Sequence, residues 1–258
     1  GSTKMDITSS ATGGELGGLI RYRSETLDPA LNELGRVALV LADQINSQLA
    51  QGIDKDGNFG ATLFADINSA KAMSERSEAK LGNSIGSGNL DVSIKDTGKL
   101  TTSDYQVTFT SATGYSVRKL PEGTEMGSYD LNDTPPPVID GFTLSLNGGG
   151  LSAGDSFKIT PTRNAAANIE TVLTDPKRLA LALPLAATNG AGNKGTGVIT
   201  QPTLTSQLDI YDATQRSQLQ AGLKNSTPVK LVFGDETTSP QAYKLYDAKG
   251  TEIGSGTI

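Results

Sequence analysis

The stretch LDPALNELGRVALVLADQI, residues 27–45, decides how the rest of the sequence is interpreted. Its apolar side chains are spaced four, three, four, three and four residues apart. This spacing is a heptad rhythm, which returns each apolar position to one side of an α-helix. The members of this seam are Leu27, Leu31, Leu34, Ala38, Leu41 and Ile45. The pattern predicts a helix that lies along other helices.

The bounds of this helix are predicted from its flanking residues. Asp28 and Pro29 form a favourable N-cap and N1 pair, and the helix is expected to end near Gly52. Before it, residues 14–26 permit a first helix despite the cost of the glycines in the run GGELGG, residues 13–18. A phosphate-binding loop would need a preceding strand and a following Lys-Ser/Thr, so these glycines indicate close helix–helix approach instead.

Beyond residue 80 the apolar period changes to two, which predicts antiparallel strands with one buried face. A first β module follows the alternating positions Leu90, Val92, Ile94, Tyr105, Val107, Phe109, Tyr115, Val117, Phe142, Leu144, Leu146, Phe157 and Ile159. Asp175-Pro176 predicts a short connecting helix over 179–183, and the Gly/Asn/Ala-rich residues 186–198 indicate a linker. A second β module then has strands at Leu208, Ile210, Val229, Leu231, Phe233, Tyr243, Leu245 and Ile253, with a hairpin turn over 247–250.

The predicted fold class is therefore α+β, with a helical segment followed by two mainly antiparallel β domains. We expect a partial helical core domain, of coiled-coil or bundle type, over residues 1–80. A first outer β domain with its short connecting helix is expected over 81–184, and a second, outermost and inserted β domain over 185–258. Gly1-Ser2 resembles a remnant of cloning, and no helix follows the last predicted strand. We therefore expect the chain to be a truncated fragment of a longer protein.

The composition excludes several classes of function. The sequence contains no Cys and no His, which removes thiol nucleophiles, the usual zinc sites and histidine acid–base chemistry. A net charge of −6 without a basic run argues against a nucleic-acid binder, and no apolar stretch is long enough to span a membrane. The segment Asp54–Asn58 resembles a calcium loop only superficially, because its Gly and its twelfth residue, Ala65, do not fit that motif. We expect no enzyme activity, no metal and no cofactor.

Two alternatives stay open on the residues alone. The seam can pack on a β module of the same chain, although its length and regularity favour a bundle by about two to one. Arg21, Arg23 and Arg36 beside the seam either pair with neighbouring subunits or are ordinary surface cations. The runner-up function is a surface-exposed adhesin-like or glycan-binding module, in which residues 190–258 make the contact.

Two segments of the sequence carry a family resemblance. The run GGELGGLIRYR, residues 13–23, is followed by LDPA at 27–30, NELG at 32–35 and ADQINSQ at 42–48. A second segment, GDSFKITPTR at 154–163, is followed by Ala166, by LTDP at 173–176 and by ALA at 180–182. Together these segments resemble the family of bacterial flagellar hook-associated protein 1, FlgK, over about residues 13–183. After Pro184 the sequence departs from the short family pattern.

The resemblance implies a structural protein of the bacterial flagellum that is exported by the type III apparatus and forms the hook–filament junction needed for motility. Its implied location is extracellular, and its implied partners are lateral copies of itself, the hook protein and the adjoining hook-associated protein on the filament side. Helices form an inner coiled-coil layer in this family, and β domains project outward. The predicted assembly interface consists of Leu16, Leu19, Arg21, Arg23, Leu27, Leu31, Leu34, Ala38, Leu41 and Ile45.

Overall fold

A computed structural model describes residues 13–196, 198–203, 212–235 and 239–258 of the chain. The chain divides into two compact units, Gly1–Asn46 with Thr62–Thr174, and Ser47–Ala61 with Asp175–Ile258. These units differ from the division predicted at residues 80 and 184, because most of the long helix belongs to the same unit as the first β module. The predicted three domains therefore stay a prediction.

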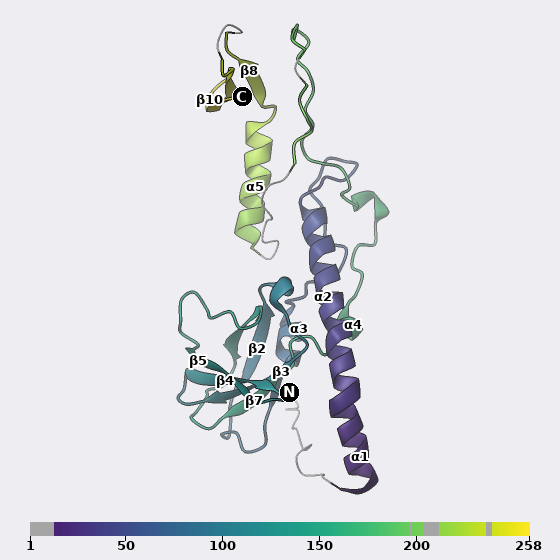
Figure 1. The fold of residues 1–258 in the computed structure, drawn as a ribbon, viewed down its shortest axis with the longest axis vertical. Coiled ribbons are helices and arrows are strands. Elements are labelled where there is room, and N and C mark those ends of the chain that lie inside the picture. The colour runs from purple at the N-terminus through teal and green to yellow at the C-terminus, as the bar shows by residue number, and fades with distance from the viewer. Residues whose placement is uncertain (1–12, 197, 204–211, 236–238) are drawn as a thin grey trace. The chain divides into compact units, whose positions relative to one another are not determined.

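The N-terminal helix runs without interruption from Gly14 to Ala50 (Figure 1). It consists of α1 (Gly14–Tyr22), a π-helical turn (Arg23–Leu27) and α2 (Asp28–Ala50). The predicted helix start at Asp28 is wrong, because Asp28 has helical angles and its amide donates to the carbonyl of Arg23. Pro29 lacks an N–H group and crowds the carbonyl four residues before it. The wider π turn accommodates both effects and lets the helix continue.

The first unit contains a β-sandwich built from two antiparallel sheets. The larger sheet has the order β1-β7-β3-β4-β5, and the smaller one pairs β2 with β6. The bounds are β1 Ser77–Ala79, β2 Asn89–Ile94, β3 Asp104–Phe109, β4 Gly114–Leu120, β5 Thr124–Asp130, β6 Phe142–Asn147 and β7 Ser156–Ile159. The sheets face one another, since the ring of Tyr105 on β3 lies 5.0 Å from that of Phe142 on β6. The alternating apolar side chains of both sheets form the core.

The period-two pattern located five of these strands correctly, namely β2, β3, β4, β6 and β7. It did not indicate β1 or β5, because β1 has three residues and β5 carries polar and exposed residues along most of its length. Short helices complete the unit: α3 (Ala70–Glu75), α4 (Ala165–Asn168) and a 3-10 turn (Thr97–Lys99). Ser69 caps α3, since its side chain accepts a hydrogen bond from the amide of Ala72.

The second unit contains a small antiparallel sheet of order β10-β9-β8. Its elements are a 3-10 turn (Pro176–Arg178), α5 (Ala213–Ser226), β8 (Lys230–Phe233), β9 (Ala242–Tyr246) and β10 (Glu252–Thr257). The predicted hairpin turn is confirmed, because the carboxylate of Asp247 accepts hydrogen bonds from the amides of Lys249 and Thr251 at 2.9 and 2.8 Å. The strand predicted at Leu208 and Ile210 lies outside the described residues.

Two features of this unit differ from the sequence predictions. The helix predicted over 179–183 is wrong, since only a 3-10 turn forms and Ala182 instead makes a β-bridge to Ile53. Five residues before Pro184 are too few to nucleate a stable helix, and the residue before a proline disfavours helical angles. The helix α5 was not predicted; Asp212 caps it by accepting hydrogen bonds from the amides of Thr214 and Gln215.

Candidate assembly surface

The long helix presents two faces of different chemistry. The face buried in the first unit is formed by Asp28, Asn32, Gly35, Leu39, Ala42 and Asn46. Each of these positions directly follows one member of the predicted seam, so the two sets are rotated by about 100° around the helix axis. The buried set is largely polar or small. A single helix therefore carries two parallel heptad series, and only the more apolar one was recognised in the sequence.

Arg163 fixes the N-terminal half of α2 to the β-sandwich through charged hydrogen bonds. Its guanidinium lies 2.8 Å from the carboxylate of Asp28 and 2.6 Å from that of Asp104, and its Nε donates to Asn32 Oδ1 at 2.7 Å. The Asn32 amide donates in turn to Asp104 and to the carbonyl of Thr102. Charge-assisted hydrogen bonds of this kind are directional as well as strong. The network therefore fixes the rotation of the helix.

Further contacts continue this attachment along the buried face. A Cβ atom on Gly35 would lie 1.8 Å from the carbonyl oxygen of Thr162, so the two backbones approach as closely as glycine allows. Near the other end, Asn46 Oδ1 accepts hydrogen bonds from the amides of Leu63 and Phe64 at 2.9 and 3.0 Å. Thr97 donates to the carboxylate of Asp43 at 2.8 Å. The helix is held at several points along one side.

The predicted seam, which we call the apolar stripe, lies on the side of the helix that these contacts leave free. The exposed fractions of its leucines are 44% for Leu27, 36% for Leu31, 57% for Leu34 and 49% for Leu41. Ala38 and Ile45 are half-buried. The β module of the same unit thus packs on the neighbouring face of the helix, and not on these four leucines. A row of exposed leucines on one rigid element is typical of a protein interaction site.

The remaining predicted interface residues lie at the start of the helix. Leu16 and Leu19 are each 61% exposed. Arg21 is exposed as well, and Arg23 Nε lies 3.5 Å from Asp28 within the same chain. A Cβ built on Gly13 or Gly18 would meet no atom within 4 Å among the described residues outside its own stretch of chain. These residues therefore have open space around them, and their predicted contacts with other subunits stay a prediction.

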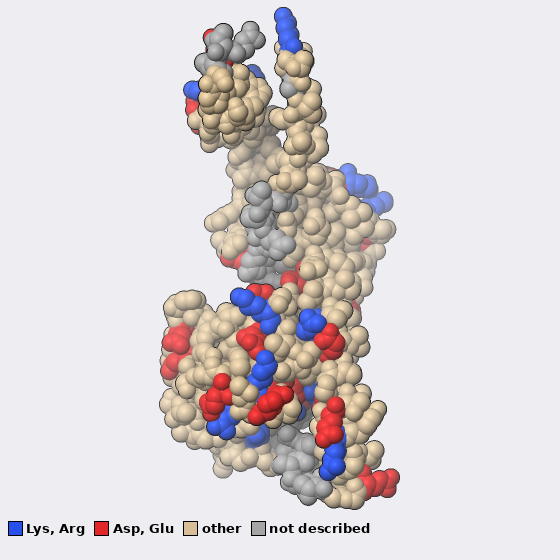
Figure 2. Space-filling model, in the orientation of Figure 1, with Lys and Arg blue, Asp and Glu red and all other residues tan. Residues whose placement is uncertain are grey.

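The charges of the first unit do not form a basic patch on the face shown in Figure 2. Lys and Arg side chains alternate with Asp and Glu there. Among the described residues, no helix is long and apolar enough to cross a membrane. No group of three or more potential ligands occurs in the described ranges that would hold a metal ion.

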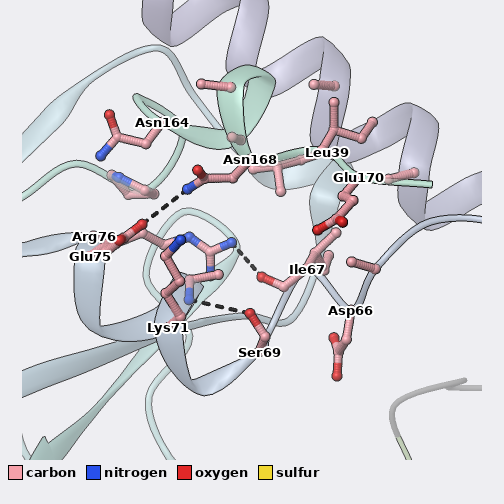
Figure 3. Close-up of a pocket in the computed structure, with 18 residues that line it drawn as sticks. Leu39, Asp66, Ile67, Ser69, Lys71, Glu75, Arg76, Asn164, Asn168 and Glu170 are labelled. Carbon is pink, nitrogen blue, oxygen red and sulfur yellow. Dashed lines mark hydrogen bonds between the residues drawn. The ribbon is translucent and has the colours of Figure 1, made fainter. Parts of the chain in front are cut away.

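A pocket of about 390 Å³ lies between α2, α3 and residues 161–170 (Figure 3). The Arg76 side chain is buried in it and donates to the carbonyls of Ile67 and Val92 at 2.5 and 2.9 Å. Asn168 donates to Glu75 at 3.1 Å. These polar groups therefore hold the surrounding loops together, which is a structural role.

The segment Asp54–Asn58, which follows the long helix, forms a turn. Asp54 accepts hydrogen bonds from the amides of Asn58 and Asp56, both at 2.9 Å, and these bonds lower the pKa of its carboxyl. Gly57 has a φ of 78°, which a side chain would disfavour. The Oδ1 atom of Asp54 is thus occupied by backbone amides of its own loop.

Comparison with known protein families gives two matches along the chain. Residues 1–64 match the family described as "Flagellar hook-associated protein FlgK helical domain", and residues 78–161 match "Flagellar hook-associated protein 1, D2-like domain". The two matches together cover more than half of the chain. They fall on the long helix and on the first β-sandwich respectively.

Individual relatives agree with these family matches. The chain is 32% identical to flagellar hook-associated protein 1 of Salmonella typhimurium over 169 residues, or 66% of this chain and 29% of that protein. The same protein of Escherichia coli is 27% identical over an equal length. The solved structure of the flagellar hook junction protein FlgK from Burkholderia pseudomallei aligns with a TM-score of 0.71 at 32% identity. That alignment covers 98% of this chain and 42% of the other, so the chain spans less than half of each of these relatives.

Proposed function

Because the chain belongs to the family of flagellar hook-associated protein 1, FlgK, we propose that it is a structural part of the bacterial flagellum at the hook–filament junction. The observation that carries this proposal is the apolar stripe, held outward on a helix whose other side is fixed to the β-sandwich. The solved relative from Burkholderia pseudomallei is itself described as a flagellar hook junction protein. A structural role needs no catalytic group, which agrees with a sequence that lacks Cys and His.

The stripe supplies adhesion between helices in this proposal. Leucines at heptad spacing insert between the side chains of a facing helix, as in a coiled coil. Burying a fully exposed leucine contributes about 1.5–3 kcal/mol, and the four leucines of the stripe, each about half exposed, contribute about half of that each to a contact. Repeated contacts between different surfaces of neighbouring copies build a ring or tube. The proposed partners are lateral copies, the hook protein and the adjoining hook-associated protein.

The proposed location follows from this role. A subunit of the hook–filament junction lies outside the cell, so we place the chain in the extracellular flagellum after export by the type III apparatus. The β-sandwich packs on the neighbouring face of the helix, about 100° around the axis from the stripe, and leaves the stripe uncovered. The adhesin-like alternative gains no support from the relatives, which are flagellar proteins.

Immunogold electron microscopy tests the proposed function directly. Antibody raised against the chain is applied to flagellated cells, and flagella from a strain that lacks the gene serve as the control. We expect label in a narrow band between hook and filament. Label along the whole filament, or on the cell body only, would overturn the proposal.

A further inference from the structure

The sheet of the second unit has one apolar face and one charged face. Strand pairing places Leu231 opposite Leu245 and Phe233 opposite Tyr243. On the third strand, Gly254 pairs with Leu245 and Gly256 pairs with Tyr243. We call these residues, Leu231, Phe233, Tyr243, Leu245, Gly254 and Gly256, the apolar face. They carry no charged side chain.

The other face has the opposite character. Its residues include Lys230, Val232, Lys244, Tyr246 and Glu252, and Lys244 lies 2.9 Å from Glu252. A face with an ion pair and a second lysine is suited to water. We therefore expect this sheet to pack against another element through its apolar face.

That packing is incomplete in the described part of the second unit. Phe233 is 49% exposed, and Leu231, Tyr243 and Leu245 are each partly exposed. Among the described residues between 181 and 258, none is buried. The nearest covering is local, since the ring of Tyr243 lies across Gly256, whose added Cβ would meet it at 2.6 Å. Among the described residues, none of the side chains of the apolar face is therefore fully covered.

The first unit shows what such a layer does. Val107, Val117 and Phe157 on its larger sheet are fully buried, because the sheet of β2 and β6 packs across them. The smaller sheet supplies Val92 and Phe142, both fully buried, from the other side. The two sheets of one unit thus complete each other. The sheet of the second unit has the same one-sided pattern, and the part of that unit that the structure describes contains no second sheet.

We propose that the apolar face of β8, β9 and β10 is one half of a β-sandwich, completed by a second β-sheet from the part of the family polypeptide that this chain does not span. The chain aligns over 42% of the Burkholderia pseudomallei protein, so more than half of that polypeptide lies elsewhere. A layer within the same polypeptide is present at a high effective concentration and needs only a small contact area.

A second copy of the chain fits this face less well. The face offers four large side chains, all partly covered already. They present less than the roughly 800 Å² that each partner buries in a stable complex of standard size. The proposal does not depend on the junction role, since it rests on the sheet and on the length of the family polypeptide that the chain does not span.

Hydrogen exchange measured by mass spectrometry tests the inference on this 258-residue chain and on the full-length polypeptide. We expect the amides of β8–β10 to exchange about tenfold or more slowly in the longer protein. Leu245→Lys, on the apolar face, should abolish this gain. The matched control Val232→Lys adds the same charge to the other face and should preserve it.

Two outcomes would overturn the inference. Equal exchange in both lengths would mean that no layer covers the face. Slow exchange in the 258-residue chain that disappears on dilution, together with a dimeric mass, would mean that a second copy covers it. Neither outcome alters the immunogold result, so failure here is distinguishable from failure of the proposed function.

Discussion

Replacing Gly35 with alanine tests whether the helix must lie against residue 162 for the first unit to be stable. The new Cβ would lie 1.8 Å from the Thr162 carbonyl oxygen and 2.8 Å from its carbon. Both atoms belong to the backbone, so no side-chain rotation relieves the contact. Contacts of Cβ below about 3.0 Å are essentially never observed, so helix and strand end must separate by more than 1 Å.

The cost of this separation follows from the neighbouring contacts. The hydrogen bond between Arg163 and Asn32 is 2.7 Å long and spans the same gap, so a shift of this size breaks it. Overpacking costs typically 1–3 kcal/mol and a broken charged hydrogen bond about 1.5–3 kcal/mol. The higher helix propensity of alanine raises the free energy of unfolding by about 1 kcal/mol and offsets part of this loss. We expect a net loss of about 2–4 kcal/mol in the free energy of unfolding.

Gly18→Ala is the matched control on the same helix, because no atom lies within 4 Å of its added Cβ. It retains the gain in helix propensity without the clash, so we expect a gain of up to about 1 kcal/mol. Urea unfolding monitored by circular dichroism at 222 nm compares the two variants with the parent chain. If Gly35→Ala stabilised the protein as much as Gly18→Ala, the close approach described here would be refuted.

Three further predictions concern the stripe, the charged network and pH. Leu34→Glu should remove the protein from the hook–filament junction, as seen by immunogold labelling. The control Gln44→Glu introduces the same charge and should leave the position of the label unchanged. Normal labelling of Leu34→Glu would exclude the stripe as an interface. Arg163→Met should cost about 2–4 kcal/mol in urea unfolding, because it removes the cation shared by two mostly buried carboxylates, although Asp28 keeps Arg23 at 3.5 Å and Asp104 keeps Lys158 at 3.4 Å. Arg118→Met at an exposed pair should cost less than about 1 kcal/mol. Burial opposes charge on Asp155, yet hydrogen bonds from the amides and hydroxyl of nearby serines lower the pKa of its carboxyl below 3.8. The contribution of the Asp155 carboxylate to the free energy of unfolding is therefore complete above pH 3.8 and is lost as the pH falls through the lowered pKa. Asp155→Asn should therefore reduce the loss of stability at acid pH, measured by urea unfolding at several pH values. An unchanged loss of stability at acid pH would contradict this.

The strands of the first unit were predictable because their side chains alternate between core and surface. Val107 and Val117, for example, sit in runs with a clear period of two, and burial on one face enforces that period. β5 has no such signal, since its residues are mostly exposed and polar. It forms because β4 presents a free edge to it, which is a property of the folded sheet and not of the segment.

The polar anchors of the helix were missed for a related reason. Arg163 lies 131 residues from Asn32, and nothing in either local segment indicates that they meet. The spacing of Asp28, Asn32, Gly35 and Leu39 did contain a second heptad series, which the stronger leucine pattern obscured. A polar heptad beside an apolar one is a signal that a helix attaches on one side and is free on the other.

The failed helix start at Asp28 shows the limit of local motifs. A Ser, Thr, Asp or Asn residue before proline is a sound start signal when the preceding residues are extended. Here the preceding residues are helical, and a wide turn takes up the proline instead. Local sequence identified the residues under strain correctly, but not the way in which the chain relieves that strain.

The wide turn at residues 23–27 also determines how far α1 is rotated around the helix axis relative to α2. Residues on either side are helical, so the number of residues in this turn sets the angular position of α1 relative to α2. Removing one residue here would rotate Leu16 and Leu19 by about 100° around the axis while leaving Leu27 and Leu31 in place. Relatives that differ by one residue at this point would therefore present their first turns to a different neighbour, which offers a simple route by which length variation redirects assembly.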